Sequence, residues 1–174
     1  MKPRNIILIG MPGSGKSTLG VLLAKAINYR FLDTDLLIQE QEGKLLREII
    51  AEKGQEAFLK IEEEVNAGVH AERTVIAPGG SAVYSERAMR HFAEIGTVVY
   101  LHVPLQELEK RLGDLTRRGV VLKEGQTLEM LLEERRPYYE RYAEVTVDVA
   151  QEDIGMLLAE IIEKLEQRKE ERGR

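Results

Sequence analysis

The stretch GMPGSGKST, residues 10–18, decides the fold of this 174-residue chain. It follows the short apolar run NIILIG at residues 5–10 and precedes a helical pattern at residues 16–27. A strand, then GxxxxGK[ST], then a helix is the context in which this motif binds phosphate. The glycines let backbone N–H groups turn inward, and the start of the helix adds partial positive charge. The stretch therefore predicts a phosphate-binding loop.

The loop also predicts which residues hold a nucleotide. We expect Lys16 to reach the β- and γ-phosphates and the Ser17 hydroxyl to bind Mg²⁺. The predicted nucleotide-binding residues of the loop are Gly13, Ser14, Gly15, Lys16, Ser17 and Thr18. The alternative is a glycine-rich turn that only joins a strand to a helix, and the motif in its context weighs against it.

Further apolar runs with strand composition lie at residues 29–33, 74–78, 97–103 and 145–149. Short, continuous runs of this type suit strands that are buried on both faces of a parallel sheet. Helical patterns lie between them, at residues 55–72, 85–95 and 104–113. The alternation predicts an α/β fold with a parallel sheet between helices.

We expect one domain over residues 1–174, because no linker or repeat divides the chain. Two segments depart from the simple alternation. Residues 34–72 form an extended helical insertion after the second strand, and residues 114–126, DLTRRGVVLKEGQ, form a polar, basic loop. The C-terminal residues 154–174 begin as an amphipathic helix and end as a solvated, fraying terminus.

Composition excludes several classes of function. The net charge of −5 argues against a general affinity for nucleic acid or anionic membrane. The chain has no cysteine, and its three histidines are too scattered to form a metal-binding motif. The apolar run at the N-terminus is too short for a signal peptide or a membrane span. We therefore expect a cytoplasmic protein, monomeric, with small-molecule partners only.

The class of nucleotide-binding protein follows from motifs elsewhere in the chain. The NKxD and DxxG patterns of a GTPase switch do not occur in the sequence. The third strand of a large ATPase ends in an acidic residue, whereas here this strand continues as VIAPGGSAV, residues 75–83. A carboxylate that completes the metal site must therefore come from another strand.

Asp33 and Asp35 supply such carboxylates, in the stretch FLDTDLL at residues 31–37. They end the second strand, so in a doubly wound sheet they should face the phosphate-binding loop. One carboxylate can bind Mg²⁺ while the other orients, and can deprotonate, an acceptor hydroxyl. The alternative is that these residues only cap the next helix, and capping is compatible with catalysis.

Taken together, the motifs resemble those of shikimate kinase. The resemblance rests on GMPGSGKST, LDTD, FLKIE at residues 58–62, PGGSAV at residues 78–83, an arginine in a loop, and ERRPYY at residues 134–139. Their order and spacing match over nearly the whole chain. The resemblance implies a three-layer P-loop fold of the nucleoside monophosphate kinase type, with five parallel strands in the order 2-3-1-4-5. It also implies transfer of the γ-phosphate of ATP to a hydroxyl of shikimate.

The resemblance assigns roles residue by residue. It implies that Asp33 helps to hold Mg²⁺, Asp35 binds the reacting hydroxyl, Gly79 and Gly80 contact substrate, Arg111 lies against adenine, Arg118 closes as a lid over the phosphates, and Arg135 grips the substrate carboxylate. It makes residues 34–72 the acceptor-binding segment and residues 114–126 the lid. A cation on a closing loop also makes sense chemically, because phosphoryl transfer spreads negative charge over the γ-oxygens. The alternative for these arginines is an exposed surface, where we place Arg117 and Arg136.

The motifs that would bind the acceptor substrate differ from the usual sequence of the family. The family usually has an arginine at the position of Leu59, where it holds one side of the substrate carboxylate. Lys60 lies about 100° further round the helix and lacks the forked guanidinium. Ser81 replaces a third glycine, and the lid reads RGVV at residues 118–121. These changes leave open a weakened shikimate kinase, a kinase of another small hydroxylated metabolite or nucleoside monophosphate, and a nucleotide-binding module without turnover.

Overall fold

A computed structural model describes residues 4–112, 122–123, 125–149 and 153–173. Five strands form one sheet in the order β2-β3-β1-β4-β5. They are β1 Asn5–Ile9, β2 Arg30–Asp33, β3 Thr74–Ala77, β4 Gly96–His102 and β5 Val145–Asp148. Every neighbouring pair is parallel. The predicted α/β fold, with its strand order and direction, is confirmed.

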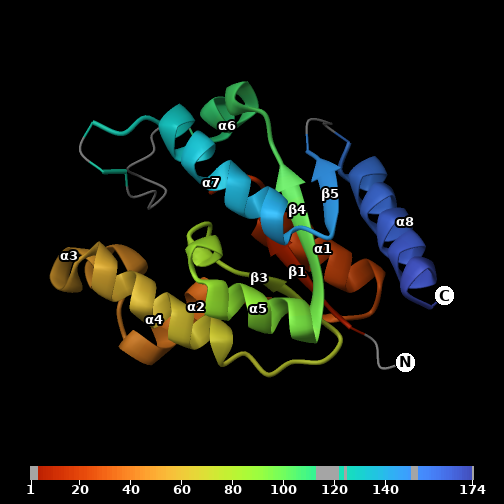
Figure 1. The fold of residues 1–174 in the computed structure, drawn as a ribbon, viewed down its shortest axis with the longest axis horizontal. Coiled ribbons are helices and arrows are strands. Elements are labelled where there is room, and N and C mark those ends of the chain that lie inside the picture. Colours follow the sequence, from red (N-terminus) through yellow and green to blue (C-terminus); the bar gives the residue numbers. More distant parts are fainter. Residues whose placement is uncertain (1–3, 113–121, 124, 150–152, 174) are drawn as a thin grey trace.

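Helices cover both faces of the sheet, which explains the continuous apolar runs. On one face lie α1 Lys16–Ala26 and α8 Ile154–Gly173, and on the other lie α5 Glu86–Ile95 and α7 Leu128–Tyr142 (Figure 1). All five residues of the central strand β1 are buried, whereas the edge strand β5 alternates buried and exposed residues. A central strand between two helical layers has no solvent-facing side, which explains why residues 6–9 of β1 are all apolar.

The carboxyl ends of the first three strands meet at one edge of the sheet. Ile9 at the end of β1 pairs with Tyr100 of β4, and Asp33 at the end of β2 pairs with Ala77 at the end of β3. The loops that follow β1, β2 and β3 therefore leave the sheet side by side. In doubly wound folds this edge is where ligands bind.

Three helices follow β2 and form the predicted helical insertion. They are α2 Thr34–Glu42, α3 Leu46–Lys53 and α4 Gln55–Ala67. Figure 1 shows α3 and α4 at one end of the molecule, opposite α8. Ile38, Ile49 and Phe58 form an apolar cluster of their own between these helices. This cluster holds the insertion together beside the main core.

The helix boundaries differ from the expected ranges near Gly43, Gly68 and Pro137. Within the expected helical insertion at residues 34–72, Gly43 ends α2 with a left-handed φ of 65°, so that α2 and α3 are separate helices. The pattern at residues 55–72 ends at Ala67, before Gly68. Conversely, α7 continues through Pro137 to Tyr142, although an interior proline removes one backbone hydrogen bond. The short helices α6 Leu105–Leu112 and η1 Ala82–Tyr84 complete the described elements.

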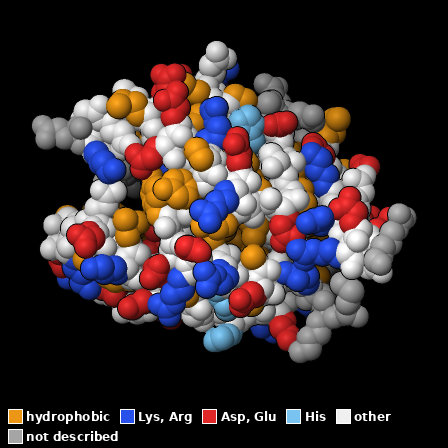
Figure 2. All heavy atoms as spheres, viewed as in Figure 1, with side chains coloured by type: hydrophobic (Ala, Val, Ile, Leu, Met, Phe, Trp, Pro, Cys, Tyr) orange, Lys and Arg blue, Asp and Glu red, His pale blue; other side chains and the backbone are white. Residues whose placement is uncertain are grey.

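Charges of both signs are interspersed over the face shown in Figure 2. A mixed surface of this kind is common for globular domains with many charged residues. Within the part of the chain that the structure describes, no helix has the length and apolar composition needed to cross a membrane.

Candidate active site

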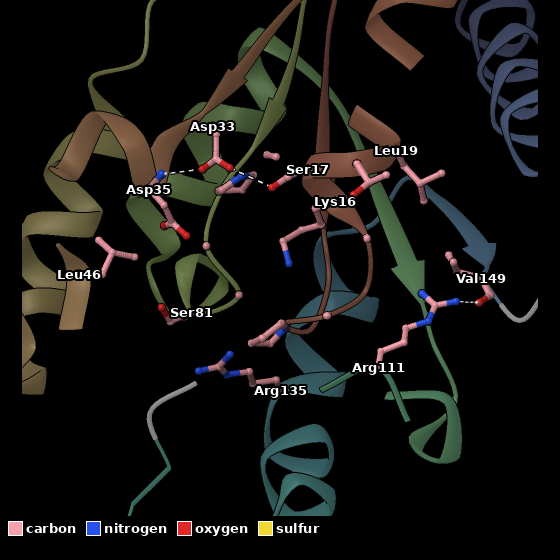
Figure 3. A pocket seen from close by; sticks show the side chains of 18 of the residues that line it. Lys16, Ser17, Leu19, Asp33, Asp35, Leu46, Ser81, Arg111, Arg135 and Val149 are labelled. Atoms are coloured by element: carbon pink, nitrogen blue, oxygen red, sulfur yellow. Dashed lines mark hydrogen bonds between the residues drawn. The ribbon is translucent and has the colours of Figure 1, made fainter. Parts of the chain in front are cut away.

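A cleft of about 980 Å³ opens at the carboxyl edge of the sheet. Its walls come from the loops after β1 and β3, the starts of α1 and α2, and parts of α4, α6 and α7. Figure 3 looks into this cleft and shows Lys16 in the middle. Asp35, Ser81 and Arg135 lie on one side of it and Arg111 on the other. We call these two parts the Asp35 end and the Arg111 end.

The loop after β1 has the backbone of a phosphate-binding loop. Gly15 caps α1 in the left-handed conformation, with φ of 93°, and Gly13 has φ of 79°. A Cβ at position 13 would lie 2.8 Å from Cδ2 of Leu112. Glycine is thus required at position 13 both by the backbone angle and by the close packing of α6.

Lys16 places its ammonium group inside this loop. Its Nζ donates hydrogen bonds to the backbone carbonyls of Gly10 and Met11, both at 2.9 Å. Burial lowers the pKa of Lys16 from its ordinary 10.5 to about 8, although the charge of Asp35 opposes the shift. A buried cation whose hydrogen-bond partners among the described residues are two carbonyls is well suited to pair with an anion that enters the loop.

The other loop residues predicted to bind nucleotide are arranged around Lys16. Gly13, Gly15, Ser17 and Thr18 line the cleft. Ser14 is fully buried beneath the loop, and its N–H donates to the carbonyl of Met11 at 3.1 Å. The roles of these residues in binding a nucleotide remain predictions.

Ser17, Asp33 and Asp35 form a connected group beside the loop. The Ser17 hydroxyl donates to Oδ2 of Asp33 at 2.9 Å, and the backbone N–H of Asp35 donates to Oδ1 of Asp33 at 3.0 Å. Asp33 therefore caps α2, which is the alternative role considered above, and it faces Ser17 at the same time. Although Asp33 caps α2, it still lines the cleft, as do Ser17 and Asp35.

The chemistry of this group fits Mg²⁺. A hydroxyl and a carboxylate are hard oxygen ligands, and Mg²⁺ is usually held by one or two carboxylates together with substrate phosphates. Among the described residues, no three acidic or histidine side chains form a metal-binding cluster. A Mg²⁺ beside Ser17 and Asp33 would therefore need phosphate oxygens to complete its ligands.

The carboxylate of Asp35 points into the cleft (Figure 3). Its Oδ1 is buried and has no hydrogen-bond partner in the described part of the chain. Burial, with a further contribution from the charge of Asp33, raises the pKa of Asp35 from 3.8 to about 6. A buried, unpartnered acceptor of this kind suits a ligand that donates a hydrogen bond, such as a hydroxyl.

Arg135 lies opposite Asp35 and is buried, with 6% of its surface exposed. The alternative that it sits on an exposed helix face is therefore wrong, whereas Arg136 beside it is exposed. The Nε of Arg135 donates to the Tyr84 hydroxyl at 3.2 Å, and its guanidinium lies over the Tyr84 ring. A Cβ at Gly80 would lie 2.9 Å from Nη1 of Arg135, so glycine there keeps this cation accessible.

Of the two remaining arginines predicted for the site, Arg111 lies among the described residues and Arg118 does not. Arg111 lines the Arg111 end, where its Nε donates to Glu107 at 2.9 Å and its Nη2 to the carbonyl of Val149 at 3.2 Å. These partners fix the guanidinium, while contact with an adenine remains a prediction. Arg118 and Arg117 lie outside the described residues, as does most of the expected lid at 114–126.

Three residues of the site were not predicted from the sequence. Glu62 reaches the Asp35 end from α4, one turn after Phe58. Tyr139 donates from its hydroxyl to the carbonyl of Gly80 at 2.8 Å, and Tyr84 supports Arg135. The spacing of Phe58 and Glu62 places both on one helix face and could have indicated Glu62. The positions of the tyrosines depend on contacts between distant elements.

The structure shows where Leu59 and Lys60, the altered positions of α4, lie relative to the cleft. Leu59 lines the main cleft and also two adjoining cavities of about 290 and 200 Å³. Lys60 does not line the main cleft, and its Nζ pairs with Oε1 of Glu56 at 3.3 Å. Lys60 is thus directed elsewhere. Arg135 and Lys123 line one of the adjoining cavities together with Leu59, and of these two cations Arg135 also lines the main cleft.

Comparison with solved structures shows which proteins share this fold. The shikimate kinase from Acinetobacter baumannii, solved in complex with shikimate, superposes with a TM-score of 0.87. It is 28% identical in sequence, and the match covers 96% of this chain and 95% of that one.

Sequence comparison gives the same assignment. The shikimate kinase from Chlorobium chlorochromatii is 36% identical over 176 aligned positions, which cover 95% of this chain and 92% of the relative. That from Mycobacterium avium is 39% identical over 162 positions, covering 91% and 92%. The family model for shikimate kinase matches residues 12–166. Because this match spans both ends of the cleft and nearly all of the sequence, the chain belongs to the shikimate kinase family.

Proposed function

We propose that this chain transfers the γ-phosphoryl group of ATP to a hydroxyl of shikimate, giving ADP and shikimate 3-phosphate. The observation that carries the proposal is the position of Lys16, between the buried carboxylate of Asp35 and the Arg111 end of the cleft. A nucleotide with its phosphates on the loop would present its terminal phosphoryl group toward Asp35. Membership of the family supports shikimate as the acceptor.

Asp35 is the proposed catalytic base. The reacting hydroxyl would donate a hydrogen bond to its carboxylate, and the hydroxyl oxygen would then form a bond to the γ-phosphorus. The bond from the γ-phosphorus to the bridging oxygen of ADP breaks, and ADP leaves with that electron pair. The hydroxyl proton passes to Asp35, whose raised pKa of about 6 makes it a better proton acceptor than an ordinary aspartate.

Cations of the cleft would balance the charge of the transferring group. Lys16 is proposed to pair with the β- and γ-phosphates, where its charge stabilises the transition state. Ser17 and Asp33 would hold Mg²⁺, which neutralises charge on the same phosphates when bound. The role of Arg118 as a lid cation rests on its place in the sequence. Arg111 is proposed to border the adenine.

Arg135 is proposed to bind the carboxylate of shikimate. With Leu59 beside it, this carboxylate gains one guanidinium partner from the described residues instead of two. A charge-assisted hydrogen bond contributes about 1.5–3 kcal/mol, which corresponds to roughly one to two powers of ten in affinity. We therefore expect a higher KM for shikimate than two arginines would give.

A second candidate acceptor follows from the wall around Leu59. Leu46, Ile50 and Phe58 line the same part of the cleft. An acceptor with a less acidic or more apolar end than shikimate would fit this wall, and the reaction at Asp35 would be unchanged.

An ADP-release assay with a coupled enzyme system tests the proposal. Shikimate, other hydroxy acids, polyols and nucleoside monophosphates are compared at equal concentration with saturating Mg²⁺ and ATP. We expect the highest kcat/KM for shikimate. A higher value for a neutral polyol would favour the second acceptor class, and ADP release that no acceptor stimulates would support a binding module without turnover.

We also propose that the enzyme acts in the cytoplasm, where ATP is available, and as a monomer.

A further inference from the structure

A second cavity, of about 290 Å³, adjoins the Asp35 end of the cleft and has no part in the proposed reaction. Gln55, Leu59 and Arg135 line both spaces, so the cavity borders the wall at which Arg135 is proposed to bind the acceptor carboxylate. The side chain of Leu59 carries no charge and no hydrogen-bonding group. A charged group in the cavity can therefore act on an anion that binds to Arg135.

Lys123 brings a second cation to this cavity. Its side chain is 61% exposed, and its Nζ lies 3.8 Å from Oε2 of Glu134. This distance is too long for a hydrogen bond, so the ammonium group keeps its capacity to donate to another anion. Its flexible four-carbon side chain with rotatable donors can adjust to an anion nearby.

A chain of contacts connects Lys123 with Arg135. The Tyr84 hydroxyl accepts from Nε of Arg135 at 3.2 Å and donates to Oε1 of Glu134 at 2.5 Å. The other oxygen of Glu134, Oε2, accepts from Nε2 of Gln126 at 3.1 Å and is the atom that faces Lys123. The two cations are thus separated by one tyrosine and one carboxylate.

The backbone of Lys123 is attached to the start of α7. Its N–H donates to Oε1 of Gln126 at 3.1 Å, and its carbonyl accepts from the backbone N–H of Gln126 at 2.9 Å. Gln126 directly precedes Thr127, whose side chain caps α7. Lys123 is therefore tied to the same helix that carries Arg135.

Two carboxylates also line the cavity, and both already have partners. Glu56 pairs with Lys60 at 3.3 Å, and Glu134 accepts the hydrogen bonds from Tyr84 and Gln126. Their charges weaken the attraction of the cavity for an anion. The loosely paired ammonium group beside them remains able to turn toward one.

We propose that Lys123 is a second acceptor-binding cation, which joins Arg135 in binding the acceptor carboxylate and takes the place that Leu59 leaves without charge. The ammonium group approaches from the adjoining cavity, while Arg135 binds from the main cleft. This inference rests on the proposed function and adds to it a residue that selects an acidic acceptor.

The test compares Lys123→Met with the wild type on two acceptors: shikimate, and shikimate amide, in which a neutral carboxamide replaces the carboxylate. With shikimate we expect KM to rise about fivefold, because the attraction of a partly exposed cation is lost. With the amide, KM should change less than about twofold. If the amide is not phosphorylated, its inhibition constant against shikimate gives the same comparison. An unchanged KM for shikimate, or equal losses on both acceptors, would overturn the proposal.

A double-mutant cycle tests whether Lys123 fills the place beside Leu59. In a Leu59→Arg background a guanidinium is available from α4, so adding Lys123→Met should raise KM for shikimate less than about twofold. A loss as large as in the wild-type background would overturn the claim that Lys123 substitutes for a charge at position 59.

Two further variants separate charge from side-chain volume and position. Lys123→Arg keeps the charge and should leave KM for shikimate within about twofold of the wild type. Lys60→Met removes a lysine of α4 that pairs with Glu56 and does not line the main cleft, so it should have no effect. A loss in either variant as large as that of Lys123→Met would overturn the role of the Lys123 charge.

The same experiments distinguish the two levels of the account. A wild type that does not phosphorylate shikimate contradicts the proposed function. A wild type that does so, combined with equal losses for Lys123→Met on shikimate and its amide, contradicts the role of Lys123 alone.

Discussion

Asp35 has a carboxylate that points into the cleft with one buried oxygen free among the described residues. We predict that Asp35→Asn lowers kcat by at least about 10²-fold, because an amide cannot accept the hydroxyl proton. ATP affinity should change little, since Lys16 and the loop remain in place. Steady-state kinetics and calorimetric titration with ATP measure the two effects, with Glu64→Gln as the control. Unchanged turnover would remove Asp35 from the mechanism.

The raised pKa of Asp35 predicts how activity depends on pH. Below a pH of about 6 this carboxyl is protonated and cannot accept the hydroxyl proton. We expect kcat/KM, measured at low concentrations of both substrates, to fall about tenfold per pH unit below this value. Glu62 titrates nearby, so the apparent value belongs to the pair. A profile that stays flat to pH 4.5, with coupling enzymes in excess, would contradict the prediction.

Glu62 also links stability to pH. Its pKa is raised from 4.5 to about 7 on folding, so the folded state binds more protons and loses stability as pH rises through this range. Glu62→Gln removes this loss. Between pH 4.5 and 8, its free energy of unfolding should therefore increase relative to the wild type by up to about 3 kcal/mol. Urea unfolding at both pH values measures the change, and a difference independent of pH would contradict it.

At the scale of elements, α4 carries Leu59, which lines the cleft where we propose that the acceptor carboxylate binds. Leu59→Arg would place a second guanidinium beside Arg135, with the adjoining cavities as space for the longer side chain. We predict that KM for shikimate falls by one to two powers of ten while KM for ATP is unchanged. Lys60→Arg is the matched control, because position 60 faces away from the main cleft and should have no effect. No improvement in Leu59→Arg would point to an acceptor other than shikimate.

The strands and most helices could be predicted because their sequence patterns are local. The continuous apolar runs predicted the buried strands, and the alternation with helices predicted the parallel sheet. The course of α7 through Pro137 could not be predicted in this way. Tyr139 stacks on Tyr100 of β4 with ring centroids 5.1 Å apart, and this packing of α7 on the sheet holds the helix beyond the proline.

The site was predictable where topology alone brings residues together. Asp33 and Asp35 follow β2 and the phosphate-binding loop follows β1, with β3 between the two strands. Parallel strands end at the same edge of the sheet, so the approach of these residues follows from the strand order. The burial of Arg135 and the contact of Glu62 with Ser81 depend on how α4 and α7 pack around the loop after β3. No local pattern encodes such packing, so these features required the structure.

For the whole molecule, one cleft is proposed to bind both ATP and the acceptor. The sheet and the loop after β1 form its centre, and the insertion of α2, α3 and α4 forms the Asp35 end. The insertion has its own apolar cluster of Ile38, Ile49 and Phe58. We therefore expect substitutions on the insertion, such as Leu59→Arg, to leave the loop that is proposed to hold ATP undisturbed.

The most direct test of this claim is to identify the product by ³¹P NMR. The protein is incubated with Mg²⁺, ATP and shikimate, and Asp35→Asn serves as the parallel sample. The account predicts a phosphate-ester signal coupled to the ring proton at carbon 3 of shikimate, appearing as the γ-phosphate signal of ATP declines, and absent with Asp35→Asn. Inorganic phosphate as the sole product of the wild type, or an ester signal of equal rate in the variant, would contradict it.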